Sequence, residues 1–219
     1  MWKGLHIKME IKGIIFDLDG VICSTDEYHY QAWKKMADDE GIYFDRKINE
    51  RLRGVSRAAS LEIILEKTDK QYSDEEKLEL MTKKNDLYKE LLSSMTEKDV
   101  SSEVLEALKA LRAKGLKLAI GSSSQNTKLI LSRIGLLDFF DGISDGTIIS
   151  QSKPNPEVFI KAAGILQLKN ENCFVVEDAE AGIDAAVAGG FHSIGIGSAS
   201  SYEKAEYKIN SFREIINLV

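Results

Sequence analysis

The sequence predicts an α/β fold, in which a parallel sheet carries helices on both faces and an all-helical block is inserted after the first strand. Short apolar runs, with the length of buried strands, alternate with segments of helical periodicity. This alternation is typical of right-handed βαβ units. Three of the apolar runs stop abruptly on polar residues. Because the carboxyl ends of parallel strands share one edge of a sheet, we expect those polar side chains to converge there.

The first predicted strand, residues 14–16, is followed at once by two aspartates and a glycine. Asp17 and Asp19 are two positions apart, a spacing that would direct both side chains to one side of the sheet. Gly20 would let the backbone turn where a residue with a Cβ resists. Uncompensated carboxylates are costly in a core, so their place at a strand end favours a binding site. The alternative is a solvated acidic turn.

Two later strands end on polar residues in the same way. Residues 116–121 form an apolar run that stops at Ser122. Residues 173–176 form another, which stops at Glu177 and Asp178. The rest of the predicted framework comprises strands at 193–196 and, weakly, 207–209, a short irregular or strand segment within 141–150, and helices at 105–114, 126–134, 159–166 and 183–188.

From residue 26 to about residue 98 the chain is rich in Lys, Glu, Leu and Met with helical periodicity. Trp33 and Ala37 illustrate an apolar helical face, and Ser73 begins a capped helix. We therefore expect a helical cap domain inserted into a catalytic core domain. The predicted boundaries are residues 25–98 for the cap and residues 1–24 with 99–219 for the core.

Composition limits the class of protein. The 219 residues are 43% hydrophobic and 29% charged, as in soluble globular proteins, and the formal net charge of −6 argues against a nucleic-acid partner. No apolar run approaches the roughly 20 residues of a membrane span, and the first ten residues are too polar for a signal peptide. Cys23 and Cys173 are interpreted as free thiols in a cytoplasmic protein. Met9 is an alternative start to Met1, and His6 is expected to be inert.

Four motifs then follow one another along the chain, namely Asp17-Leu18-Asp19-Gly20-Val21, the strand ending at Ser122, Lys153 before Pro154, and the strand ending at Glu177-Asp178. In this order they resemble the four signatures of the haloacid dehalogenase-like superfamily. The resemblance covers nearly the whole chain from residue 11 onward. It implies a Rossmann-like sheet with an inserted cap, and it makes Asp17 the covalent nucleophile.

Phosphoryl transfer to a carboxylate needs a nucleophile, charge neutralisation and a proton donor for the leaving oxygen. Asp17 is anionic and would repel a phosphate, so a cation is expected between them. Hard oxygen ligands suit Mg²⁺, and four are available, from Asp17, the backbone carbonyl of Asp19, Glu177 and Asp178. We expect Asp19 to act as general acid and base. Lys153 would supply a fixed positive charge, and Ser122 with nearby N–H groups would hold the phosphoryl oxygens.

Each of these residues also has a simpler interpretation. The alternative for Lys153 is an ordinary exposed lysine. Residues 122–124 would then be only a loop. Glu177 and Asp178 would be an acidic helix start favoured by the helix dipole.

The helical block resembles the β-phosphoglucomutase family more closely, at Thr25-Asp26-Glu27-Tyr28-His29 with Trp33, at Gly54-Val55-Ser56-Arg57 with Ser60, and at Lys84-Asn85-Asp86. On this resemblance Arg57 would hold the phosphate that is not transferred. Thr25 and His29 would lie near the hinge and influence Asp19. The sugar site would be lined by Trp33, Ser60, Lys84, Ser124 and Asn126. Helix packing is an equal alternative for Trp33, and an ordinary cap histidine is the alternative for His29.

Three departures from the family pattern bear on the substrate. Ser24 replaces an aspartate that is common after the first motif, and Ala58-Ala59 replace the usual acidic residues, so Arg57 would be less restrained. Ser101-Ser102 replace a Pro-Gly turn, and Ser102 is expected to N-cap the next helix instead. None of these changes removes a predicted catalytic group.

The leading hypothesis is a monomeric, Mg²⁺-dependent mutase that interconverts β-D-glucose 1-phosphate and glucose 6-phosphate through a glucose 1,6-bisphosphate intermediate. The second is a sugar-phosphate phosphatase of the same superfamily, in which water accepts the phosphoryl group. The third, from another class, is a phospho-ligand-binding protein without turnover. The presence of Asp19 argues against the third, because a binding module has no need of an acid/base carboxylate.

Overall fold

The computed structural model describes residues 10–219, so Met1, Met9 and His6 lie outside the described part. Six parallel strands form one sheet in the order β3-β2-β1-β4-β5-β6. Their bounds are β1 Gly13–Phe16, β2 Lys117–Gly121, β3 Gly142–Ser144, β4 Cys173–Glu177, β5 His192–Gly195 and β6 Tyr207–Lys208. The predicted parallel α/β fold is confirmed. The segment 141–150, left open between loop and strand, contains the edge strand β3.

Helices cover both faces of the sheet, and the alternation of side chains along β1 explains why. Ile14 and Phe16 face a large apolar cluster. That cluster also takes in side chains of α5 (Ser102–Ala113), α6 (Thr127–Arg133) and the 3₁₀ segment η4 (Phe212–Asn217). Ile15 faces the other way, into a cluster formed with α7 (Glu157–Leu166) and α8 (Glu180–Ala188). All three β1 side chains are fully buried, as a strand covered on both faces requires.

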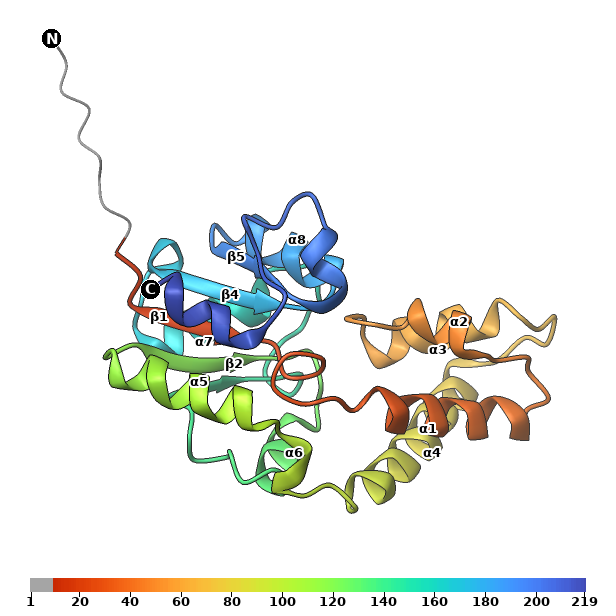
Figure 1. Cartoon of the computed structure of the whole chain (residues 1–219). Helices are drawn as coiled ribbons and strands as arrows, with labels where there is room; N and C mark the ends of the chain where they lie inside the picture. The colour runs from red at the N-terminus through yellow and green to blue at the C-terminus, as the bar shows by residue number, and fades with distance from the viewer. Residues whose placement is uncertain (1–9) are drawn as a thin grey trace, which may run out of the picture.

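The segment between β1 and β2 begins with four helices, which we call the cap: α1 Asp26–Asp39, α2 Arg46–Glu50, α3 Arg57–Leu65 and α4 Asp74–Leu92. Trp33, Leu61 and Ile64 belong to an apolar cluster that is separate from those of the sheet. In Figure 1 the cap lies beside the sheet, at the end to which the arrows of β1 and β4 point. The boundaries at residues 24/25 and 98/99 stay a prediction.

Two helix starts test the capping predictions. Ser73 and Glu76 form the reciprocal capping box at the start of α4, which confirms the predicted helix start. The prediction for α5 was wrong by one residue, since the hydroxyl of Ser101, and not that of Ser102, accepts a hydrogen bond from the Val104 N–H. Ser101 has extended backbone dihedrals, as an N-cap requires. Ser102 is already the first residue of the helix.

Candidate active site

A cavity of about 520 Å³ lies between the cap and the carboxyl edge of the sheet. Both walls come from segments far apart in the sequence. Every side chain that the sequence predicted for the site lines this cavity, namely Asp17, Asp19, Thr25, His29, Trp33, Arg57, Ser60, Lys84, Ser122, Ser124, Asn126, Lys153, Glu177 and Asp178. The convergence expected from the strand ends therefore occurs, although the chemical role of each residue stays a prediction.

Asp17 and Glu177 share one buried lysine at the edge of the sheet. Lys153 Nζ lies 2.5 Å from Asp17 Oδ1 and also donates to Glu177 Oε1. The lysine is only 4% exposed, so the ordinary surface lysine is excluded. Burial alone would lower the pKa of Lys153, but the two carboxylates outweigh it and hold that pKa above its usual value. The lysine is thus a fixed positive charge beside Asp17.

Asp178 completes a cluster of three carboxylates. One side-chain oxygen from each of Asp17, Glu177 and Asp178 lies within 4.8 Å of the other two. Burial, reinforced by the Asp17 charge, raises the pKa of Asp178 to about 8. A carboxyl with so high a pKa lacks a sufficient cationic partner. Three converging oxygens with excess negative charge fit a small hard cation such as Mg²⁺.

Gly20 shows how tightly this edge is packed. Its φ is +84°, and a Cβ there would lie 2.1 Å from Asp178 Oδ2. The turn after β1 therefore passes directly over the third carboxylate. A side chain at this position would occupy the space between the two acidic loops.

Asp19 is held apart from the three carboxylates. Its Oδ1 accepts a 2.6 Å hydrogen bond from the backbone N–H of Thr25, the residue just before α1. Burial raises the pKa of Asp19 to about 6. The Thr25 hydroxyl accepts a 3.0 Å hydrogen bond from the Tyr88 hydroxyl, so the connection runs from Asp19 into the cap. A carboxyl that is buried, in the cavity and poised near neutrality suits proton transfer.

The cap wall holds a buried lysine that pairs with no carboxylate in the described part of the chain. Lys84 is 2% exposed, and its Nζ lies 2.8 Å from His29 Nδ1 and 4.8 Å from the centre of the Trp33 ring. Burial, and then the positive charge of Arg57, hold the pKa of Lys84 well below its usual value. Burial and the Lys84 charge likewise lower the pKa of His29, which leaves the imidazole neutral and able to accept from the lysine.

Trp33 packs in the cap and also borders the cavity. It is 2% exposed and belongs to the apolar cluster of the cap, and it also lines the cavity. Trp33 therefore stabilises the cap by packing, and its contact with a sugar stays a prediction. Ser60, one turn into α3, is buried and lines the same wall.

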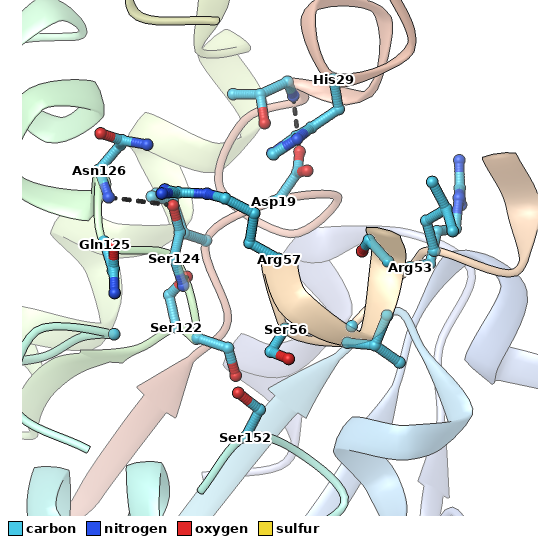
Figure 2. Close-up of a pocket in the computed structure, with 18 of the residues that line it drawn as sticks. Asp19, His29, Arg53, Ser56, Arg57, Ser122, Ser124, Gln125, Asn126 and Ser152 are labelled. Carbon is cyan, nitrogen blue, oxygen red and sulfur yellow. Dashed lines mark hydrogen bonds between the residues drawn. The ribbon is translucent and has the colours of Figure 1, made fainter. Parts of the chain in front are cut away.

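Arg57 reaches from the start of α3 toward Ser124 and Asn126 of the core (Figure 2). One of its N–H groups donates a 2.7 Å hydrogen bond to the side-chain oxygen of Asn85. Within residues 10–219 neither Arg57 nor Lys84 forms an ion pair with a carboxylate. Two partly or fully buried cations without counter-ions, on one wall of a cavity, are the signature of an anion site.

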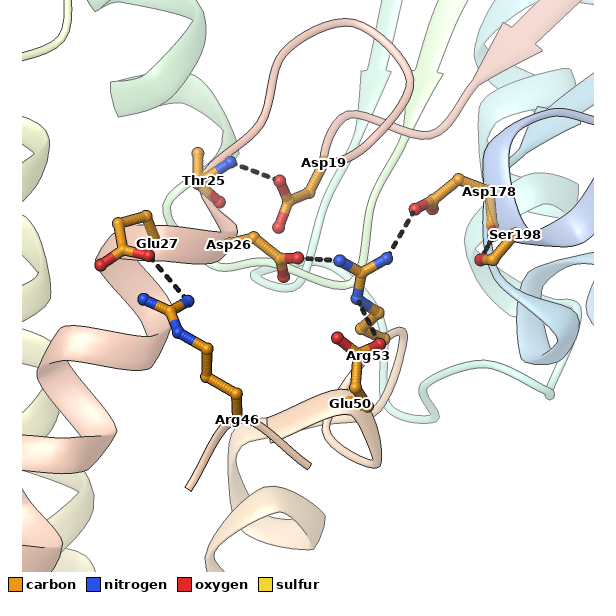
Figure 3. A network of polar contacts seen from close by, with 9 residues as sticks. All are labelled: Asp19, Thr25, Asp26, Glu27, Arg46, Glu50, Arg53, Asp178 and Ser198. Carbon is orange, nitrogen blue, oxygen red and sulfur yellow. Dashed lines mark hydrogen bonds and ion pairs between the residues drawn. The ribbon is translucent and has the colours of Figure 1, made fainter. Parts of the chain in front are cut away.

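Arg53 is a cap residue of the cavity that the sequence did not single out. Its guanidinium contacts Asp26 and lies 3.6 Å from Glu50, both in the cap, and 3.8 Å from Asp178 in the core. Figure 3 shows the guanidinium between Asp26 and Asp178. Within the described part of the chain, it is the one cationic side chain of the cap that forms an ion pair with a carboxylate at the acidic edge of the sheet. This ion pair bridges the two walls.

Tyr88 was also missed, and Asn85, although part of the Lys84-Asn85-Asp86 resemblance, was given no role. The spacing of Lys84 and Tyr88, four residues apart on α4, could have indicated Tyr88, because such residues share a helical face. Asn85 and Arg53 carried no such signal, since their partners are 28 and 27 residues away in sequence. Both depend on how the helices of the cap cross.

A family model described as a haloacid dehalogenase-like hydrolase matches residues 11–190. The chain belongs to this family. The match includes all four motifs and every predicted site residue. The family and the relatives show that this protein is an enzyme, either a mutase or a related phosphatase.

Known relatives fall into both of these groups. A β-phosphoglucomutase of Bacillus subtilis is 42% identical over 189 residues, covering 85% of this chain and 84% of the relative. A fructose-1-phosphate phosphatase of Escherichia coli is 26% identical over 184 residues, covering 84% of this chain and 95% of the relative. Among solved structures, a β-phosphoglucomutase of Clostridium difficile has a TM-score of 0.88 at 38% identity, covering 94% of this chain and 93% of that one. Within residues 10–219 no helix combines the length and apolarity that a membrane crossing requires.

Proposed function

We propose that this protein is a β-phosphoglucomutase, which interconverts β-D-glucose 1-phosphate and glucose 6-phosphate through glucose 1,6-bisphosphate. The observation that carries the proposal is the opposite charge of the two cavity walls. The core wall has three clustered carboxylates and one shared lysine. The cap wall has Arg57 and Lys84, which form no ion pair with a carboxylate of residues 10–219. A ligand with a phosphoryl group at each end suits such a cavity, with one group at Asp17 and the other at Arg57.

Asp17 is the nucleophile in this mechanism. A carboxylate oxygen of Asp17 attacks the phosphorus, and the bond from phosphorus to the sugar oxygen breaks. Lys153, fixed beside Asp17, balances part of the charge that spreads over the phosphoryl oxygens. Ser122 and the neighbouring backbone N–H groups hold those oxygens in place. Mg²⁺, held by Asp17, Asp178, Glu177 and the Asp19 carbonyl, would supply the remaining neutralisation of charge.

Asp19 moves the proton. It donates a proton to the sugar oxygen that leaves phosphorus, and in the reverse half-reaction it accepts one from the sugar hydroxyl that attacks. Its raised pKa means that both protonation states are accessible near neutral pH. The hydrogen bond from Thr25 N–H fixes one carboxylate oxygen and leaves the other for the substrate.

A sugar-phosphate phosphatase is the second candidate, because phosphatases occur among the relatives, including one of phosphorylated carbohydrates from Thermotoga maritima that is 28% identical. The first experiment supplies β-glucose 1-phosphate with trace glucose 1,6-bisphosphate and Mg²⁺. A mutase produces glucose 6-phosphate, whereas a phosphatase releases inorganic phosphate. Release of phosphate without glucose 6-phosphate would overturn the mutase proposal.

Arg57→Ala separates the two candidates further. Loss of a bidentate phosphate contact in a partly desolvated site costs about 2–5 kcal/mol, roughly 30- to several-thousand-fold in kcat/KM for the sugar phosphate. Hydrolysis of acetyl phosphate should stay near the wild-type rate, because that small donor has no second anionic group for the cap. Arg51→Ala is the matched control, since Arg51 pairs with Glu66 on the surface, outside the cavity. Equal loss of both activities would instead make Arg57 a structural residue.

A further inference from the structure

Asn85 joins three elements around the proposed anion site. Its side-chain oxygen accepts two hydrogen bonds, one of 2.7 Å from Arg57 and one of 3.0 Å from the Asn126 side-chain amide. Asn85 lies on α4 and Arg57 begins α3, both in the cap, whereas Asn126 is the N-cap position of α6 in the core. Asn85 itself is not part of the cavity lining, although Arg57 and Asn126 are. It lies behind them.

The chemistry of this acceptor matters for a neighbouring anion site. An amide oxygen orients a guanidinium through a hydrogen bond without adding negative charge. A carboxylate in its place would form an ion pair with Arg57 and compete with a phosphate for it. Aspartate is available next to this position, as Asp86, but within residues 10–219 it acts on Arg57 only through its charge and forms no ion pair with it. The arrangement therefore restrains Arg57 through a neutral acceptor and leaves its N–H groups free of a carboxylate in the described part of the chain.

The second hydrogen bond ties this restraint to the position of the cap. Asn126 Nδ2 can reach Asn85 only when α4 lies against the start of α6. A further contact between the walls, from Arg53 to Asp178, involves a different part of the cavity. Arg57 is thus aimed by a contact that exists when the cap is placed over the core.

We propose that Asn85 is a positioning residue, which aims Arg57 at the distal phosphoryl group of the substrate and keeps the guanidinium charge free for it. Because the same side-chain oxygen also accepts from Asn126 of the core, the orientation of Arg57 depends on closure of the cap. This role rests on the proposed function, in which Arg57 holds the phosphate that is not transferred. It does not involve the reacting atoms.

The test compares Asn85→Ala and Asn85→Asp in the intact enzyme. A hydrogen bond to a charged group contributes about 1.5–3 kcal/mol, so Asn85→Ala should raise KM for β-glucose 1-phosphate roughly 10- to 100-fold. Acetyl phosphate hydrolysis should be unchanged. Asn85→Asp is isosteric and keeps an acceptor for both donors, yet it should raise KM at least as much, because it neutralises Arg57. Lys89→Ala, on the exposed face of the same helix, should behave as wild type.

Asn85→Asp separates this role from a structural one. If Asn85 served only the packing of the cap, the aspartate variant would bind the sugar phosphate like wild type, and that result would overturn the proposal. If Asn85→Ala does not fold, Asn85→Asp alone decides. The double variant with Arg57→Ala should be no worse than Arg57→Ala by itself, since Asn85 acts through Arg57.

Failure of the proposed function gives a different pattern. If Arg57→Ala leaves KM for the sugar phosphate unchanged, the distal phosphate is not held there, and the mutase proposal and the role of Asn85 fall together. If Arg57→Ala raises KM and neither Asn85 variant does, only the role of Asn85 is overturned.

Discussion

The two walls of the cavity are built in different ways. The core wall is made of strand ends. Asp17 and Asp19 closely follow β1, Glu177 is the last residue of β4, and Asp178 comes directly after it. The cap wall is made where helices meet, so Arg57 comes from α3 and Lys84 from α4. Burial, reinforced by the neighbouring carboxylates, raises the pKa of Asp178 on the core wall, and burial, reinforced by Arg57, lowers the pKa of Lys84 on the cap wall. Apart from the Arg53–Asp178 ion pair, the charges of the two walls are not paired with each other in the described part of the chain.

This difference separates two tasks. In the proposed mechanism the core wall holds the groups that form and break a bond to phosphorus, namely Asp17, Asp19 and Lys153. The cap wall holds groups suited to recognition of an anion. Changes in the core should therefore affect every substrate, and changes in the cap should affect only substrates large enough to touch it. The predictions below test that division, from the largest expected effect to the smallest.

Asp17→Asn should abolish turnover of both β-glucose 1-phosphate and acetyl phosphate, because a neutral amide cannot form the acyl phosphate. Intact-mass measurement after mixing with acetyl phosphate checks the assignment, with the phosphoryl group expected on Asp17 in the wild type and on no residue in the variant. Phosphate found on one of the serines 122–124 would contradict the mechanism.

Asp19→Ala should slow transfer to and from the sugar about 10²- to 10⁴-fold, the usual contribution of a positioned general acid and base. Affinity for Mg²⁺, measured by calorimetry, should change little, since the expected ligand at this position is the backbone carbonyl. The Asp19 side chain forms its hydrogen bond with Thr25 rather than with the three carboxylates. A variant that loses Mg²⁺ binding but still transfers phosphate would reverse the two roles.

Lys84→Met tests the cap wall. Methionine keeps the apolar length of the side chain and removes the charge, so KM for the sugar phosphate should rise about 10- to 100-fold, as for loss of a charged hydrogen bond. Acetyl phosphate hydrolysis serves as the internal control and should be unaffected. A parallel fall in both activities would show that the two walls are not separable in the way proposed.

Arg53→Gln should produce the smallest effect, on the ion pair between Arg53 and Asp178 that connects the two walls. Removing a positive charge 3.8 Å from Asp178 should tighten Mg²⁺ binding about two- to fivefold, because a partly exposed pair contributes up to about 1 kcal/mol. Titration calorimetry of the apoprotein measures this, with Arg51→Gln as control. Weaker Mg²⁺ binding would mean that Arg53 organises Asp178 instead of competing for it.

How well the sequence predicted the molecule follows the same division. Asp17, Ser122 and Asp178 could be placed together because parallel strands end at a common edge, which topology alone requires. The edge strand β3 was ambiguous because three residues give too short a pattern. The N-cap of α5 was misplaced because two serines are adjacent and either has the right chemistry. These errors are local and do not move the site.

The cap was harder, for a physical reason. Its helices were predictable from periodicity, but the contacts of Arg53 and Asn85 arise from crossing geometry that no single helix encodes. The site residues on that wall came from resemblance to a family, and the structure brings all of them to the cavity. What resemblance did not supply was the absence of carboxylate partners for Arg57 and Lys84 within the described residues. Whether a buried cation has a carboxylate partner depends on all the residues packed around it, which come from several helices.

The close approach at Gly20 has a consequence for the mutational tolerance of this enzyme. A Cβ at that position would lie 2.1 Å from Asp178 Oδ2, and the backbone there is left-handed. Residues other than glycine are therefore strongly disfavoured at position 20. On the cap wall Gly54 also has a left-handed backbone, with φ +72°, but a Cβ there would lie an ordinary 3.5 Å from Ala179 Cβ, so space restricts this wall less than the acidic edge. Selection for a new phosphorylated substrate can therefore proceed on the helices, while the acidic edge is inherited without change. Under the proposed function, catalytic chemistry and substrate range would be separate variables for engineering.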